Sequence, residues 1–235
     1  FLGADDIQVK IEELREATNY QVPIFLKMGA TRPRYDVAIA AKAGVDVVVV
    51  DGAEGGTGAS PELLLDHTGI PLISAIRAAR EALDDCGKTD EVSLVAAGGI
   101  RSGTDVAKCL ALGADAVMIG TAGLVALGCN SPRYFDDYAA LGTAPGRCHH
   151  CHTGLCPVGV ATQDPELEKR VDVPAASERV ARFLTAMTME VSLLAKACGK
   201  SNVHNLEVED LRAMSLEASA FTGVKLAGID RPYSW

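Results

Sequence analysis

Four cysteines near the middle of the chain carry the most distinctive chemistry in this sequence. Cys148, Cys151 and Cys156 stand in one short segment that Pro157 closes, and Cys129 precedes them directly after a glycine. Closely spaced thiolates on such a loop suit an iron–sulfur cluster or a zinc ion. A zinc finger is less favoured, because no second pair of ligands follows at the usual distance. The four cysteines are therefore candidate ligands of an iron–sulfur cluster.

The overall composition is that of an enzyme from a reducing compartment. The cysteines number seven, and their clustering favours a metal site over a disulfide framework. The 235 residues are 48% hydrophobic with 23 glycines, as in many α/β enzymes. A net charge of −9 argues against non-specific binding of nucleic acid. Because neither a membrane-spanning apolar run nor a signal peptide is evident, we predict a cytoplasmic location and no membrane association.

Short apolar runs alternate with helical patterns over the first half of the chain. Strands buried on both faces are predicted at residues 23–28, 46–51, 93–97 and 115–120. Helices are predicted at about residues 35–43, 73–86, 104–112, 175–197 and 207–214. The βα repetition predicts an α/β fold with a parallel sheet, either a barrel or a doubly wound fold.

Four βα units make up half of a TIM (β/α)8 barrel, and a half barrel has an open edge and an unfilled interior. We therefore expect four earlier strands, either on another chain or on an upstream part of this one. Residues 1–128 would form the C-terminal half of the barrel, with its fifth to eighth strands. Residues 129–163 would form a cysteine-rich iron–sulfur loop, and residues 164–235 a helical extension.

Glycine motifs at the ends of the last two predicted strands indicate a phosphate site. Gly98 and Gly99 follow the third strand, and Gly120 and Thr121 end the fourth. Paired glycines let backbone N–H groups approach an anion, and the N-terminus of the following helix adds its dipole. In barrels the phosphate site lies in the loops after the last two strands. Glycines of ordinary tight turns are the alternative.

The second predicted strand runs into a glycine-rich loop, residues 51–60, that is expected to lie against a flat ring or a carboxylate substrate. Bare backbone permits close approach, and barrels carry their active sites on this face. A flexible linker is the alternative, although linkers rarely begin with an acid on a buried strand. The loop residues predicted to contact the ring or the substrate are Asp51, Gly52, Gly55, Gly56, Thr57 and Gly58.

Lys27 interrupts the first predicted apolar strand, where a lysine is rarely buried without a partner. At the carboxyl end of a barrel strand its ammonium would point at the ligand, where it could stabilise an anionic reduced flavin ring. Pairing with a carboxylate inside the barrel is the alternative.

In this order, the motifs resemble the FMN-binding domain of glutamate synthase, from about residue 23 to residue 197. The resemblance is carried by Lys27, DGAEGGTGAS at 51–60, AGGIRSG at 97–103, LVALGC at 124–129 and CHTGLCPVGVATQDPELEKR at 151–170. It implies a TIM barrel with FMN and an iron–sulfur cluster beside it. It also implies that ammonia condenses with 2-oxoglutarate and that the imine is reduced to L-glutamate, with electrons reaching FMN through the cluster.

The resemblance implies a role for each matching residue. Lys27 would lie near the flavin and the keto acid, and the loop that begins at Asp51 would line the ring and the substrate. The glycines at 98, 99 and 120, with Thr121, would hold the FMN phosphate. Glu54 is a candidate for proton transfer at the flavin edge. Arg32 and Arg34 are candidates for binding the dicarboxylate, although a solvated surface charge is the more common fate.

The cysteine segment departs from the pattern of the large glutamate synthases. Cys129, Cys151 and Cys156 match the three cluster ligands, but an insertion at residues 130–150 separates the first from the others. The insertion brings Cys148, so four thiolates would permit a 4Fe–4S cluster in place of a 3Fe–4S one. Replacement of Cys129 by Cys148 as third ligand is the alternative.

Residues 203–228 resemble the shorter, archaeal-type branch of this family, which lacks the amidotransferase region of the large enzymes. Ammonia-supplying and electron-donating subunits or domains are therefore expected as partners. One rival hypothesis is the N-methylglutamate synthase (methylamine–glutamate N-methyltransferase) subunit, and another is a non-catalytic electron-transfer subunit. A 2-hydroxy-acid oxidase is disfavoured, because Ala53 and Glu54 stand where those enzymes need a histidine.

Overall fold

A four-stranded parallel sheet forms the centre of the molecule. The computed structural model describes residues 3–55 and 60–230. The strands are β1 (Phe25–Gly29), β2 (Val47–Asp51), β3 (Ser93–Ala97) and β4 (Ala116–Met118), hydrogen-bonded in the order β1-β2-β3-β4. All four lie within two residues of their predicted bounds. The continuous valine run of β2 is buried, as expected for a strand covered on both faces.

Helices connect the strands and continue beyond the sheet. Those between strands are α2 (Pro33–Lys42), α3 (Glu62–His67), α4 (Leu72–Asp85) and α5 (Gly103–Ala111), preceded by α1 (Ala4–Ala17). After β4 come α6 (Thr121–Leu127), α7 (Phe135–Ala140), α8 (Pro165–Glu168), α9 (Val173–Ala197) and α10 (Leu216–Thr222). The structure confirms the helices predicted at 35–43, 73–86, 104–112 and 175–197. Asp172 caps α9 by accepting a hydrogen bond from the Ala175 N–H at 3.1 Å.

The sheet has two unlike faces. Helices α2 and α4 pack on one face, where Val37, Ile76 and Leu83 join Val48 and Leu94 in the main core. On the opposite face, alternate residues of β2 and β3 form a small core of their own. In sequence these are Val47, Val49, Val95 and Ala97. Within the described residues β1 and β4 each pair on one side only, and Phe25 and Met118 on them are largely exposed.

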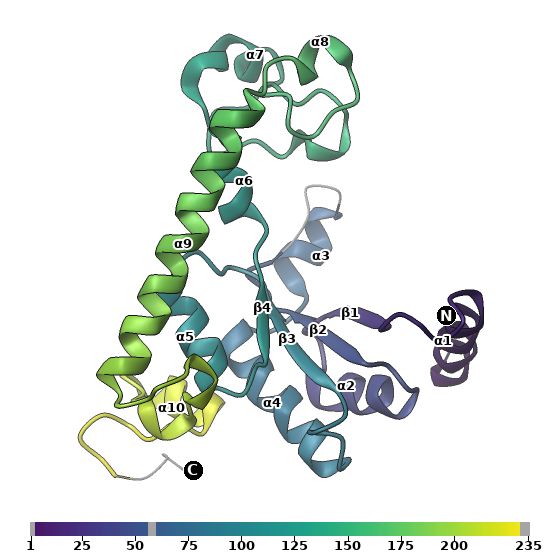
Figure 1. Ribbon diagram of the computed structural model, residues 1–235, viewed down its shortest axis with the longest axis vertical. Coiled ribbons are helices and arrows are strands. Elements are labelled where there is room, and N and C mark those ends of the chain that lie inside the picture. Colours follow the sequence, from purple (N-terminus) through teal and green to yellow (C-terminus); the bar gives the residue numbers. More distant parts are fainter. Residues whose placement is uncertain (1–2, 56–59, 231–235) are drawn as a thin grey trace.

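The cysteine-rich segment sits apart from the sheet. Figure 1 shows it with α7 and α8 at one end of α9, while α10 lies at the other end of that helix. Helix α9 packs on α5 and α6, so its 25 residues, roughly 37 Å at the usual rise, connect the two regions. No helix in the described part of the chain is long and apolar enough to cross a membrane.

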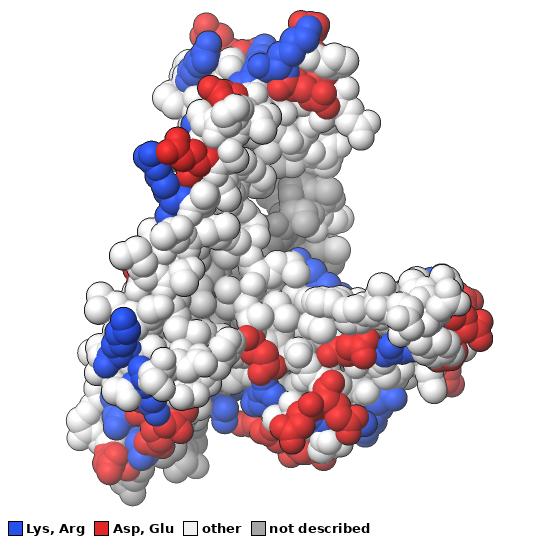
Figure 2. Space-filling view, in the orientation of Figure 1, with Lys and Arg blue, Asp and Glu red and all other residues white. Residues whose placement is uncertain are grey.

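The middle of α9 is uncharged on the face drawn in Figure 2, whereas charged side chains gather toward both of its ends. Three large apolar side chains of α9, those of Leu184, Met189 and Leu193, are exposed. This stretch of the helix is therefore uncovered in the part of the protein that the structure describes.

One predicted helix is wrong, and several short ones were not expected. Residues 207–214 contain only a 3-10 turn, Val208–Asp210, because the Ala213 N–H donates to the Lys225 carbonyl at 2.9 Å instead of continuing a helix. Helices α6, α7 and α10 have six or seven residues, too few turns to show a clear period.

Candidate functional site

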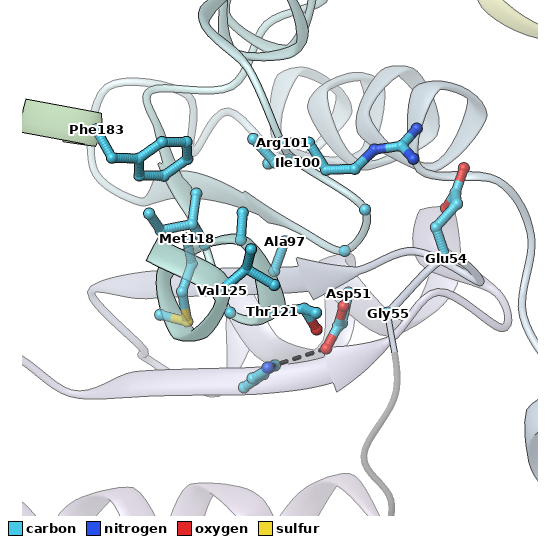
Figure 3. A pocket seen from close by; sticks show the side chains of 16 residues that line it. Asp51, Glu54, Gly55, Ala97, Ile100, Arg101, Met118, Thr121, Val125 and Phe183 are labelled. Carbon is cyan, nitrogen blue, oxygen red and sulfur yellow. Dashed lines mark ion pairs between the residues drawn. The ribbon is translucent and has the colours of Figure 1, made fainter. Parts of the chain in front are cut away.

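A cavity of about 800 Å³ opens at the carboxyl ends of the strands. Two carboxylates, two cations and bare glycine backbone form its polar wall, and apolar side chains form the rest, as Figure 3 shows. It is lined by Lys27, Asp51, Glu54, Gly55, Ala97, Gly98, Gly99, Ile100, Arg101, Met118, Ile119, Gly120, Thr121, Ala122, Val125 and Phe183. Parallel α/β folds place ligands at this edge of the sheet, so the cavity is the candidate binding site.

Lys27 and Asp51 form an ion pair on the cavity wall. The Lys27 Nζ lies 2.9 Å from Asp51 Oδ2, and the lysine side chain is 51% exposed. Lys27 therefore lines the cavity and is paired with a carboxylate, while its expected action on a flavin remains a prediction. The second carboxylate oxygen, Asp51 Oδ1, is buried and has no hydrogen-bond partner among the described residues.

The glycines after β3 hold the backbone in conformations that other residues adopt at a cost. Gly98 and Gly99 have φ angles of +103° and +70°. A Cβ on Gly98 would lie 2.9 Å from Asp51 Oδ1, and one on Gly99 would lie 2.7 Å from the Glu54 Cβ. On Gly120 a Cβ would meet nothing within 4 Å, so the backbone there is open. Glycine is needed at 98 and 99 for conformation and close packing, as well as for access.

In the described part of the loop after β2, Asp51, Glu54 and Gly55 line this cavity and Gly52 does not. Gly52 lines a smaller neighbouring cavity of about 290 Å³, which shares Lys27, Asp51 and Gly55 with the larger one. A Cβ on Gly52 would lie 2.7 Å from the Leu72 Cα, so this glycine lets α4 approach β2. The predicted contacts of Gly56, Thr57 and Gly58 lie outside the described residues.

The Glu54 carboxylate lines the cavity but is already engaged. It accepts a hydrogen bond from the Leu72 N–H at 2.9 Å and so caps the start of α4. Its predicted part in proton transfer remains a prediction.

The start of α5 is bonded by the chain's own side chains, and the expected use of its dipole for a ligand remains a prediction. Glu190 of α9 accepts from the Gly103 N–H at 2.7 Å, and Ser102 and Asp105 form a capping box. Burial opposes ionisation of Asp105, but hydrogen bonds from the Arg101 and Ser102 N–H groups outweigh it and hold the pKa of that carboxyl below its usual value. Carboxylates already occupy the positive end of this helix.

Arg101 and Phe183 are site residues that sequence reasoning missed. No carboxylate pairs with the Arg101 guanidinium in the part of the chain that the structure describes, so this cation is available to an anionic ligand. It stands inside the AGGIRSG motif, which could have pointed to it. Phe183 comes from α9, far along the chain, and no local pattern marked it.

Arg32 and Arg34 are wrong as candidate substrate binders. Arg32 pairs with Asp36 one turn along α2, and Arg34 reaches Glu81 of α4 at 2.6 Å. Neither lines the cavity. Both arginines form ion pairs on the protein surface, which was the alternative considered.

The four clustered cysteines do come together. Burial first, and then the thiols of Cys151, Cys156 and Cys148, raise the pKa of Cys129. Burial, and then the thiols of Cys148 and Cys156, raise the pKa of Cys151. Cys156 is buried, while Cys151 is exposed. Within residues 3–55 and 60–230, however, no three metal-binding side chains converge as a single-ion site would require. The segment thus gathers four thiols in one place without the geometry of a mononuclear metal centre.

Tyr138 lies at the middle of this cysteine site. Its ring is fully buried against Cys156 and Val158, and its hydroxyl donates to the Cys129 carbonyl. Burial, and then the thiols of Cys129, Cys148 and Cys156, raise the pKa of Tyr138 to about 12. The phenol therefore stays protonated at neutral pH and can act as a donor.

Helix α6 joins the cavity to the cysteine site. Its first residues, Thr121 and Ala122, line the cavity, and Cys129 follows two positions after its end. Seven residues span roughly 10 Å at the usual helical rise. Arg179 of α9 donates to the Leu127 carbonyl at 2.7 Å and so caps the end nearest to Cys129. The two sites are therefore close neighbours with a rigid connection.

Fold and site define a parallel α/β protein with a glycine-lined ligand cavity beside a cysteine cluster. A family model described as the conserved region in glutamate synthase matches residues 1–201. The chain is 53% identical over 226 residues to the "Glutamate synthase large subunit-like protein" of Rhizobium meliloti, covering 96% of this chain and 51% of that protein. It is 40% identical over 229 residues to the "Archaeal glutamate synthase [NADPH]" of Methanocaldococcus jannaschii, covering 95% and 42% respectively. The chain belongs to the glutamate synthase family, and it spans about half the length of these relatives.

Solved structures bear on the fold. A flavocytochrome b2 mutant with pyruvate bound matches with a TM-score of 0.52 and 23% identity, over 84% of this chain and 36% of that one. At that identity the likeness concerns the fold alone, and it agrees with the parallel α/β arrangement described above.

Proposed function

We propose that this chain is the flavin and iron–sulfur part of a glutamate synthase that converts 2-oxoglutarate and ammonia to L-glutamate. Family membership and the names of the relatives support this activity. The observation that carries it is the placement of family motifs from three separate strands on one cavity, with the cysteine motif joined to it by α6. The relatives' names suggest NADPH as the electron source of the whole enzyme.

FMN fits the cavity by size and chemistry. A volume of about 800 Å³ lies within the range of cofactor sites. The open backbone at Gly120 offers an anion site for the phosphate, together with the Arg101 guanidinium, which has no carboxylate partner among the described residues. Gly98 and Gly99 line the same wall without side chains. Met118, Val125 and Phe183 supply an apolar wall for a ring system.

Arg101 provides a direct test of FMN binding. Loss of a charge-assisted hydrogen bond costs about 1.5–3 kcal/mol, so Arg101→Met should weaken FMN binding roughly 10- to 100-fold in a fluorescence titration. Arg182→Met is the matched control, because Arg182 pairs with Glu178 on the exposed side of α9. Equal affinity of both variants for FMN would count against the proposed phosphate site.

The chain's own residues would then orient the reactants. Bound FMN supplies hydride to the carbon of the imine that forms from 2-oxoglutarate and ammonia. The Lys27 ammonium, held by Asp51, lies on the cavity wall and can hold a carboxylate or keto oxygen of the substrate. Glu54 remains a candidate for moving a proton at this edge, provided that its carboxylate leaves the Leu72 N–H.

The four thiols are proposed to bind an iron–sulfur cluster rather than a single metal ion. Cys129, Cys148, Cys151 and Cys156 would hold it, either all four or three of them. The resemblance of the cysteine motif to the family's cluster motif is what favours a cluster over a single zinc ion, which four thiolates could also bind. The cluster would transfer single electrons to and from the flavin site.

The sheet is proposed to be the second half of a TIM barrel. The open edges of β1 and β4 and the flavocytochrome b2 match over 36% of that chain support this arrangement. The first half would come from another part of the protein or another chain. Ammonia-supplying and electron-donating subunits or domains would complete the enzyme.

An anaerobic absorption spectrum of the intact, full-length protein tests this function, with iron and FMN measured on the same sample. Flavin bands over a broad iron–sulfur shoulder, both bleached by dithionite, are expected. Reduced enzyme should then form L-glutamate from 2-oxoglutarate and ammonia. Preference for methylamine would point to N-methylglutamate synthesis instead, and zinc without flavin would refute the proposal.

A further inference from the structure

Segment 130–150 is folded tightly onto the cysteine site, although it was expected to be an irregular insertion. It contains a 3-10 turn, Pro132–Tyr134, followed directly by α7. Tyr138 of α7 is the largest fully buried side chain in the described chain. Around it lies a small core separate from that of the sheet, with Cys129 and Cys148 packed against Cys156 and Val158.

Helix α7 fixes one edge of the cysteine site through Cys129. The Cys129 N–H donates to the Leu124 carbonyl of α6 at 3.0 Å, and its carbonyl accepts from the Tyr138 hydroxyl. Both main-chain polar groups of this residue are therefore bonded, one to the helix that leaves the cavity and one to the inserted helix. With its backbone held on both sides, the Cys129 thiol has only its own side-chain torsion left to vary.

The same helix fixes the opposite edge through Asp137. The Asp137 carboxylate lies 3.2 Å from the Arg170 guanidinium, which donates to the Pro157 carbonyl at 2.6 Å. That guanidinium also stacks on the Tyr134 ring, 4.8 Å from its centroid. Pro157 follows Cys156 directly, so one short helix is bonded to the backbone beside the first and the last cysteine of the site.

We infer that Tyr138 is a positioning residue, whose hydroxyl fixes Cys129 relative to the 148–156 loop and thereby sets how firmly the metal centre is held. The inference rests on the proposed iron–sulfur cluster. Hydrogen bonds to the residues that bind a metal orient those residues, and they tune both the affinity for the metal and the reduction potential of the site. Asp137 acts in the same way on the other edge, through Arg170.

Tyr138→Phe tests this role in the full-length holoenzyme, because it keeps the ring and removes only the hydroxyl. We expect iron release to a chelator to be at least tenfold faster than in the wild type, and the cluster's midpoint potential and electron paramagnetic resonance signal to shift. FMN content should be unchanged, because Tyr138 does not line the cavity. Tyr134→Phe is the control, because that hydroxyl makes only a long contact, 3.4 Å, to the Arg170 carbonyl.

Asp137→Asn is a second variant in case the buried substitution prevents folding. The Asp137 side chain is 43% exposed, so the change should be tolerated, and we expect release about threefold faster. If Tyr138→Phe released iron at the wild-type rate and kept the wild-type midpoint potential and paramagnetic resonance signal, the inference would be overturned. The proposed function would be unaffected. If Tyr138→Phe does not fold, a wild-type release rate in Asp137→Asn overturns it. Absence of iron from the wild-type protein itself would instead refute the cluster, and the inference with it.

Discussion

The cavity at the sheet and the cysteine site are built in different ways. The cavity wall comes from parallel strands joined by continuous hydrogen-bond ladders and backed by helices, with most of its charges already paired. The cysteine site contains no strand within its described residues and is held by a few bonds from side chains to main-chain carbonyls, over a core of three buried residues. We conclude that the cavity is preformed, whereas the cysteine site depends on individual clamps and on its proposed cluster.

The largest effect is expected from the Lys27–Asp51 ion pair on the cavity wall. Lys27→Met would leave the Asp51 carboxylate without this partner and remove the cation proposed to hold the substrate. We expect glutamate formation to fall about 100-fold, as measured by steady-state assay of the full-length enzyme. Lys10→Met is the control, because Lys10 makes a similar pair with Glu13 on the surface of α1. If the two variants kept equal activity, Lys27 would have no part in the reaction.

Removal of iron should change hydrogen exchange in the cysteine site but not in the sheet. After anaerobic chelation, amide hydrogen exchange in residues 129–163 should accelerate at least tenfold, because the clamps alone would hold the segment. Exchange in β2 and β3 should stay the same, because the ladders between them do not depend on the cysteines. Uniform acceleration throughout the chain would show that the regions fold as one unit, and the comparison would be wrong.

A pair of glycine variants tests how closely the cavity wall is packed. Gly98→Ala should destabilise the protein by about 2 kcal/mol, since it adds a contact at 2.9 Å to an unfavourable φ. Gly44→Ala is the matched control, because Gly44 has a φ of +93° and a Cβ there would meet nothing within 4 Å, so about 1 kcal/mol is expected. Denaturant unfolding measures both. Equal losses would mean that the backbone after β3 yields to the added methyl group.

The smallest change in stability is expected from the capping box at the start of α5. Asp105→Ala should cost about 1 kcal/mol at neutral pH. Because its hydrogen bonds hold the folded-state pKa of Asp105 below the unfolded value, this stabilisation is complete above the unfolded pKa. It is lost as pH falls through the folded one. The difference between variant and wild type in urea unfolding should therefore shrink in acid. Glu13→Ala on α1 should change stability by less than about 0.5 kcal/mol.

Local pattern predicted the sheet well and the cysteine segment poorly. Buried parallel strands are continuous apolar runs, so the bounds of β2 and β3 followed from their apolar residues. Helix α7 has six residues, and its two bonds to the cysteine site, at Cys129 and through Arg170, are made with residues outside the helix. No periodicity of its own marks such a helix.

By itself, the sequence determined the positions of the strands, the glycines at 98 and 99 and the close spacing of three cysteines, because each depends on residue type and spacing within a short window. Only the tertiary structure decided that Lys27 pairs with Asp51, that Glu54 caps α4 and that Phe183 reaches the cavity. These contacts join residues from separate elements. They depend on how helices pack against the sheet, which short-range periodicity does not encode.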